Sequence, residues 1–167
     1  QAERRGPVSR LKVTETFVSI QGEADAVGWP TLFVRLTGCP LRCVYCDTQY
    51  AFHGGEWRET GELVDIAKGS GVRRVCVTGG EPLVRRNLER LIELLAAIPG
   101  LDLTLTTNGS LLAKKAQALK AAGLKRITVS LDSLDDAVFM KMNDVDFPVA
   151  RVLDGIAAAA AAGLTPI

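Results

Sequence analysis

The chain has 167 residues, of which 47% are hydrophobic and 23% are charged. That composition excludes global disorder, and the length suits one domain with its own hydrophobic core. The 20 basic and 19 acidic side chains leave a net charge of +1, which is not the strongly basic balance typical of nucleic-acid binding. Without an apolar run long enough for a membrane span or a signal-peptide pattern, we expect a cytoplasmic protein with neither a membrane nor a nucleic acid as partner.

The residue pattern predicts an α/β fold. Residues 1–11 are polar and basic and contain Gly and Pro, so we expect a flexible arm followed by one domain over 12–167. Strand-like and helix-like segments then alternate, which is typical of parallel strands with helices packed outside them. The expected strands cover 31–37, 74–78, 101–106 and 126–130, with 164–167 beginning a fifth, and the expected helices cover 62–68, 87–98, 111–122 and 150–162.

Polar and glycine residues follow three of the expected strands. They are Thr78 with Gly79 and Gly80, the Thr106-Thr-Asn108-Gly109 segment, and Ser130-Leu-Asp132. Because parallel strands end at one edge of a sheet, these residues are expected to form a ligand site there. The alternative is that they only cap the helices that follow.

The four cysteines predict a metal or redox site. Cys39, Cys43 and Cys46 form a C-x3-C-x2-C cluster, whereas Cys76 stands alone inside an expected strand. Three thiolates on one loop can hold three corners of an iron–sulfur cube and leave the fourth iron open. The alternative is a zinc site completed by Cys76 or by His53, the single histidine. A cysteine between two valines is more often a small buried hydrophobic residue, so we expect Cys76 to be buried.

These features together resemble the radical S-adenosylmethionine (SAM) enzymes. The resemblance rests on the cysteine motif, on Gly79-Gly80-Glu81-Pro82 after the next strand, and on Thr106 and Ser130 at later strand ends. It implies a partial (β/α) barrel of the radical SAM type, a 4Fe–4S cluster on Cys39, Cys43 and Cys46, and SAM bound at the open iron. One electron from an external reductant of the flavodoxin kind would release a 5′-deoxyadenosyl radical. The cofactor-binding residues that it implies are Tyr45, Gly79, Gly80, Glu81, Pro82, Thr106, Asn108 and Ser130.

Within this superfamily the two halves of the chain resemble different enzymes. Residues 12–83 resemble 7-carboxy-7-deazaguanine synthase (QueE), through ETFVSIQGE at 15–23, FVRLTGC at 33–39 and CDT at 46–48. Residues 83–167 resemble GTP 3′,8-cyclase (MoaA), through VRRNLERLIELL at 84–95, LTLTTNG at 103–109 and RITVSLDS at 126–133. The chain is therefore interpreted as a chimera of two families or as a natural intermediate between them.

The synthase resemblance supplies the first interpretation of function. It implies conversion of 6-carboxy-5,6,7,8-tetrahydropterin to 7-carboxy-7-deazaguanine, a lyase reaction on the route to queuosine. It also implies that Thr48 helps to hold Mg²⁺ and that Gln21, Gly22, Glu23 and Arg35 contact the pterin. A carboxylate can accept the N–H pair of a pterin edge, and an arginine can bind a carboxylate through two hydrogen bonds. The alternatives are a turn residue for Thr48 and a surface ion pair for Glu23 and Arg35.

Two other functions stay open. The second half favours GTP 3′,8-cyclase, the first enzyme of molybdenum cofactor biosynthesis. A non-catalytic metal-binding module, with zinc or no metal on the cysteines, is the third interpretation. An exposed edge at the last strand would also allow the chain to form a homodimer.

Overall fold

The computed structural model describes residues 9–167, so most of the predicted N-terminal arm lies outside the described residues. The last two residues of that predicted arm are structured, contrary to expectation. Arg10 begins strand β1 (Arg10–Ile20), and Leu11 is only 1% exposed. Leu11 is buried because its side chain belongs to the main hydrophobic core, and this burial stabilises the start of the strand.

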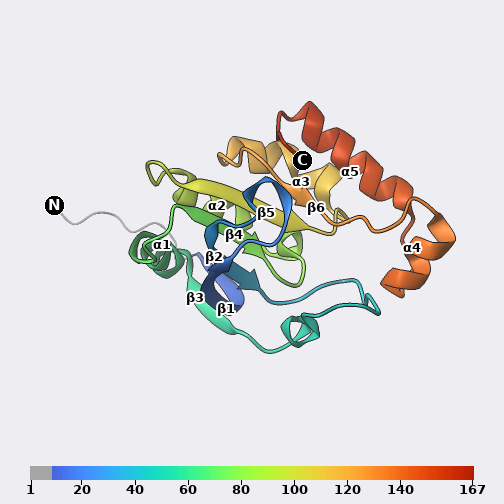
Figure 1. Cartoon of the computed structure of the whole chain (residues 1–167), viewed down its shortest axis with the longest axis horizontal. Coiled ribbons are helices and arrows are strands. Elements are labelled where there is room, and N and C mark those ends of the chain that lie inside the picture. Colours follow the sequence, from blue (N-terminus) through green and yellow to red (C-terminus); the bar gives the residue numbers. More distant parts are fainter. Residues whose placement is uncertain (1–8) are drawn as a thin grey trace.

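One mixed sheet organises the chain, in the order β3-β1-β2-β4-β5-β6 (Figure 1). Strands β2, β4, β5 and β6 run parallel, as the sequence predicts, whereas β1 pairs with both β2 and β3 in antiparallel fashion. The α/β class is confirmed, with two unexpected antiparallel strands at one edge. The strands after β1 are β2 (Pro30–Leu36), β3 (Glu56–Glu59), β4 (Arg74–Thr78), β5 (Asp102–Thr107) and β6 (Thr128–Val129).

The helices lie close to their predicted positions. α1 (Thr60–Gly69) contacts α2 (Leu88–Ala96), and α3 (Leu112–Ala121) lies beside α5 (Val149–Ala161). Helix α4 (Asp136–Asn143) was not predicted, and it lies at the far right of the molecule in Figure 1. Within residues 9–167 the fold is completed by three short 3-10 helices, namely η1 (Ala24–Ala26), η2 (Gln49–Phe52) and η3 (Pro82–Val84).

The segment 164–167 does not form the strand that we expected. It runs beside residues 125–127, where Thr165 N donates to Lys125 O and Ile127 N donates to Pro166 O. Pro166 has no N–H group to donate to a ladder, and two hydrogen bonds over four residues do not make a strand.

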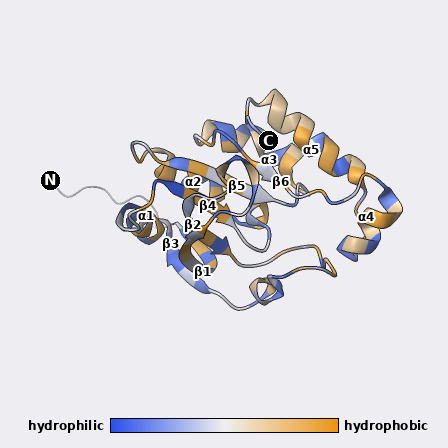
Figure 2. Cartoon of the chain, viewed as in Figure 1, coloured by the Kyte–Doolittle hydropathy of each residue, from blue (hydrophilic) through white to orange (hydrophobic). Residues whose placement is uncertain are grey.

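Alternation along the strands divides the sheet into two faces. Buried aliphatic residues of β2, β4 and β5 point to the helices, where the register aligns Val34 with Val77 and Val77 with Leu105. The intervening residues point the other way, and there Phe33 lies beside Cys76. Figure 2 shows hydrophobic and hydrophilic residues alternating along the helices, as expected for helices that cover one face of a sheet.

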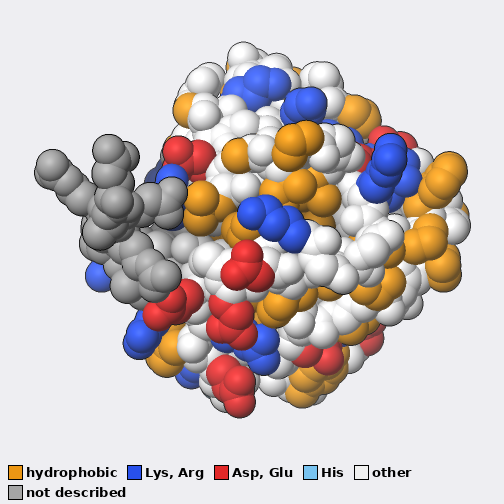
Figure 3. Space-filling model, turned by 90° about the vertical axis from the view of Figure 1, so that its left-hand side faces the viewer, with side chains coloured by type: hydrophobic (Ala, Val, Ile, Leu, Met, Phe, Trp, Pro, Cys, Tyr) orange, Lys and Arg blue, Asp and Glu red, His pale blue; other side chains and the backbone are white. Residues whose placement is uncertain are grey.

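The surface agrees with the near-neutral charge of the chain. The face drawn in Figure 3 mixes acidic and basic side chains with scattered hydrophobic ones. None of the helices in the described residues has both the length and the apolar character needed to cross a membrane.

Candidate functional site

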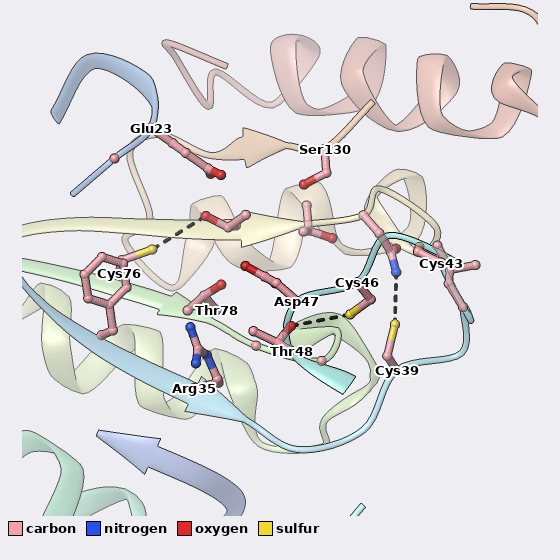
Figure 4. A pocket seen from close by; sticks show the side chains of 18 of the residues that line it. Glu23, Arg35, Cys39, Cys43, Cys46, Asp47, Thr48, Cys76, Thr78 and Ser130 are labelled. Carbon is pink, nitrogen blue, oxygen red and sulfur yellow. Dashed lines mark hydrogen bonds between the residues drawn. The ribbon is translucent and has the colours of Figure 1, made fainter. Parts of the chain in front are cut away.

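A cavity of about 700 Å³ lies over the face of the sheet that the helices leave free. Its walls come from β1, β2, β4 and β5, from the strand ends, from α4, and from the cysteine loop (residues 38–48) (Figure 4). Most of the site residues predicted from the sequence line it. These are Gln21, Gly22, Glu23, Arg35, Cys39, Cys43, Tyr45, Cys46, Thr48, Gly79, Gly80, Thr106, Asn108 and Ser130.

Strand register explains why these residues meet. Arg35 of β2 lies opposite Thr78 of β4, one step of the alternation beyond the pair of Phe33 and Cys76. Phe33 in turn stacks on Phe17 of β1, with ring centroids 5.2 Å apart. Because side chains alternate between the two faces of a strand, one face of the sheet presents an aromatic ring, a thiol, a cation and a hydroxyl, from Phe33, Cys76, Arg35 and Thr78.

The cysteine loop leaves β2 through a tight backbone turn. Gly38 has a φ of 94°, which favours glycine, and its N–H donates to the carbonyl of Ala51 at 2.7 Å. Its own carbonyl accepts from Glu81 N at 2.7 Å. The loop is thus attached both to η2 and to the turn that follows β4.

Each cysteine of the loop has a different polar neighbour. Cys39 Sγ accepts from Asn108 Nδ2 at 3.7 Å, Cys43 Sγ donates to Asn143 Oδ1 at 3.3 Å, and Cys46 Sγ lies 3.5 Å from Thr48 Oγ1. Burial raises the pKa of the Cys39 and Cys43 thiols. A cation bound at the loop would favour their thiolate forms, as metal coordination requires.

The loop fits an iron–sulfur cluster better than a single zinc ion. Among the described residues, no group of three or more His, Cys, Asp or Glu side chains is placed to hold one metal ion. Three thiols that each bind a different iron do not need to converge on one point, whereas zinc ligands do. Cys76 lies at the opposite end of the cavity from the other three in Figure 4. The donor set therefore supplies three ligands and leaves a fourth position open.

Cys76 is buried, as predicted, at 1% exposure, yet it also lines the cavity. Its Sγ lies 3.5 Å from Thr106 Oγ1, and burial raises its pKa. Figure 4 places Glu23 at the same end of the cavity. This end offers the Glu23 carboxylate and neutral polar groups, away from the three thiols of the cysteine loop.

Arg35 brings a cation to the cavity from β2. It forms an ion pair with Glu15 at 2.6 Å, and its guanidinium also contacts the Tyr50 hydroxyl and the Phe17 ring. The Arg35 Nε atom is buried without a hydrogen-bond partner in the described part of the chain. Arg35 therefore forms an ion pair, which was the predicted alternative to substrate binding, and it also lines the cavity.

The turn after β4 separates into two parts. Gly79 and Gly80 line the cavity, whereas Glu81 and Pro82 lie outside its lining and are buried. Glu81 accepts hydrogen bonds from Leu83 N at 2.9 Å and from Thr107 Oγ1 and Asn108 N, both at 2.7 Å. The Glu81 carboxylate therefore fastens the end of β4 to the end of β5.

Some lining residues were not predicted as site residues. Phe17, Phe33 and Cys76 could have been found from the alternation of the strands, because each occupies a position facing away from the helices. Asp132 accepts a hydrogen bond from the Tyr45 hydroxyl, which joins the cysteine loop to the segment after β6. Asn143 approaches Cys43 across 100 residues of sequence, and no local pattern indicates that contact.

The family assignment agrees with this geometry. The family model of the Radical SAM superfamily matches residues 33–167, which include the cysteine loop and all the parallel strand ends. The chain therefore belongs to the radical SAM superfamily. Membership implies a 4Fe–4S cluster and SAM as cofactors, and the three-thiol loop fits that cluster.

Curated relatives are GTP 3′,8-cyclases. The chain is 43% identical to the enzyme of Acidothermus cellulolyticus over 86% of this chain and 43% of that protein. It is 44% identical to that of Xanthomonas axonopodis pv. citri, over 83% of this chain and 46% of the other. The chain thus spans less than half the length of these relatives.

A solved structure of QueE from Escherichia coli is also similar. Its TM-score is 0.51 at 26% identity, covering 60% of this chain and 53% of that chain. The two resemblances found in the sequence therefore both reappear, with the higher identity on the cyclase side.

Proposed function

We propose that this radical SAM enzyme acts on GTP and starts a 3′,8-cyclisation. The observation that supports this proposal is the extent of the similarity to the cyclases. A match over 86% of the chain reaches well into the first half, where the sequence motifs favoured the synthase. The comparisons thus favour the cyclase over the synthase, our first interpretation.

The cavity offers groups suited to a guanine nucleotide. When bound, the cluster and SAM supply a carbon radical that abstracts a hydrogen atom from the substrate. The Glu23 carboxylate lines the cavity at the end away from the cysteine loop, and it can accept two N–H groups from a guanine edge. Arg35 lies on the same face and carries the charge to contact a phosphate.

The synthase is the second candidate, and the placement of the predicted pterin contacts favours it. Gln21, Glu23 and Arg35 all line the cavity, and so does Thr48, next to Cys46. A tetrahydropterin presents the same amino-oxo-pyrimidine edge as guanine, so Glu23 can serve either substrate. Mg²⁺ at Thr48 belongs to this candidate only. The external reductant and the homodimer stay predictions.

The test is substrate-dependent cleavage of SAM. The chain is purified and its cluster reconstituted without oxygen, and 5′-deoxyadenosine is measured after addition of dithionite with GTP, ATP, the carboxypterin or no substrate. We expect GTP to give the highest yield. Glu23→Gln should lower the GTP-dependent kcat/KM by about tenfold to a hundredfold, because a hydrogen bond to a charged group contributes roughly 1.5–3 kcal/mol.

Two cysteine variants are matched controls for that test. Cys43→Ala should lose both iron and 5′-deoxyadenosine formation, whereas Cys76→Ala should keep its iron because Cys76 lies at the other end of the cavity. Turnover of the carboxypterin alone, with a requirement for Mg²⁺ that Thr48→Ala removes, would establish the synthase instead. A colourless protein with bound zinc would favour the non-catalytic module.

A further inference from the structure

The end of α4 is fastened to the cysteine loop on both sides of Cys43. Arg42 N donates to the carbonyl of Asn143 at 3.0 Å, and Val44 N donates to the carbonyl of Met142 at 2.9 Å. These hydrogen bonds use only backbone atoms of the helix end. They hold Asn143 against Cys43 whatever side chain position 143 carries.

The two polar atoms of the Asn143 side chain differ in their contacts. Asn143 is 2% exposed and lines the cavity. Its Oδ1 accepts from Cys43 Sγ at 3.3 Å, whereas its Nδ2 is buried and has no hydrogen-bond partner among the described residues. A buried amide N–H without an acceptor is costly, so its presence here points to an acceptor in the liganded site.

Binding of Cys43 to iron reverses its hydrogen-bonding character. A thiol can donate to Oδ1, but a thiolate bound to a metal only accepts. The contact at 3.3 Å would then join two acceptors. The oxygen and nitrogen of a carboxamide are nearly the same size, so half a turn about the last side-chain bond places Nδ2 against the sulfur.

The other hydrogen-bond donors close to Cys43 already have acceptors. The Tyr45 hydroxyl also lies within hydrogen-bonding reach of the Cys43 sulfur, but its single O–H donates to Asp132, and Asn108 Nδ2 donates to Cys39 Sγ at 3.7 Å. The Asn143 amide is therefore the group in place to serve the Cys43 sulfur, in the same way that Asn108 serves Cys39.

We propose that Asn143 is a positioning residue that donates an N–H···S hydrogen bond to cluster-bound Cys43 and raises the reduction potential of the cluster. Such a bond stabilises the more negative, reduced cluster more than the oxidised one, and hydrogen bonds to sulfur are among the features that set cluster potentials. The inference rests on the cluster that superfamily membership implies and not on the choice of substrate.

The test is a redox titration of the reconstituted cluster, followed by electron paramagnetic resonance. Asn143→Leu removes the donor and keeps the branching of the side chain at Cγ, and Asn143→Asp replaces the donor with an acceptor. Both variants should keep their iron. The midpoint potential of Asn143→Leu should fall by ~59 mV, a tenfold change in the one-electron equilibrium. Asn143→Asp should lower it at least as far.

Phe139→Leu is the matched control within α4. Phe139 is 2% exposed and packs beside Phe147 without supplying a hydrogen bond to any cysteine. This variant should lower the melting temperature and leave the potential unchanged. An equal fall in potential for Phe139→Leu would overturn the proposal, because it would trace the effect to a loosened helix.

Unchanged potentials in both Asn143 variants with full iron would overturn the inference alone. Loss of iron from both variants would also overturn it, since Asn143 would then be needed to build the loop. Failure of the unmodified chain to bind iron would overturn the proposed function as well, so the two failures are distinguishable.

Discussion

Glu81 belongs to the Gly79-Gly80-Glu81-Pro82 motif, but it is buried behind the residues that line the cavity. Its carboxylate is completely buried and accepts hydrogen bonds from Leu83, Thr107 and Asn108. Burial raises its pKa above the ordinary value, and the three hydrogen bonds only partly offset that effect. Asn108 also donates to Cys39, so Glu81 supports the cysteine loop indirectly, through Asn108.

The raised pKa of Glu81 determines how stability should change with pH. Below pH 4.5, its ordinary pKa, the carboxyl is protonated in both states. As the pH rises further the unfolded chain loses its proton first, so the free energy of unfolding falls until the folded pKa is passed. Glu81→Gln should therefore flatten the decline in stability as the pH rises above 4.5. Urea unfolding at several pH values measures this, and an unchanged slope would contradict it.

The turn after β4 is the element that depends most on glycine. Gly79 and Gly80 have φ values of 79° and 48°, and a Cβ on Gly80 would lie 2.4 Å from the Gly38 carbonyl oxygen. That oxygen already accepts from Glu81 N at 2.7 Å. The turn and the start of the cysteine loop therefore approach each other through backbone atoms alone.

Gly80→Ala should lower the free energy of unfolding by more than about 1 kcal/mol, because both the backbone angle and the contact oppose a side chain. Gly61→Ala is the matched control, since Gly61 lies in α1 with no atom within 4 Å of the added Cβ. It should instead stabilise the chain by roughly 0.5–1 kcal/mol. Chemical unfolding of the two variants compares them, and equal effects would refute this account of the turn.

Elements with strong local patterns were predictable from the sequence. β4 was predicted to its exact residues, because an apolar run ends there at Thr78-Gly79-Gly80. β1 and β3 were missed, since both are antiparallel strands in which charged residues interrupt the apolar ones, and β3 lies at the edge of the sheet. The predicted strand at 126–130 shortens to Thr128–Val129.

The candidate site was predictable where one motif supplies it and not where distant segments meet. Most of the residues that the cysteine spacing and the strand-end polar positions indicated line one cavity. The contacts of Asn143 with Cys43 and of Asp132 with Tyr45 depend on where α4 and β6 lie in space. Glu81 and Pro82 lie outside the lining because the backbone turns inward after Gly80.

At the scale of the whole molecule, Arg126 joins strand β5 to the connection between β1 and β2. Arg126 binds both oxygens of Asp102 on β5, at 3.1 and 2.8 Å, and also pairs with Asp25 in η1. The connection between β1 and β2, which carries Glu23, is thereby held near β6.

Transfer of deuterium from labelled GTP tests the central claim most directly. Joining C3′ to C8 requires loss of the hydrogen at C3′, and the proposed reaction passes that hydrogen to the deoxyadenosyl group. With GTP deuterated at C3′, mass spectrometry should find deuterium in the 5′-deoxyadenosine formed by the reconstituted chain. 5′-Deoxyadenosine without deuterium, formed equally with and without GTP, would contradict the proposed function.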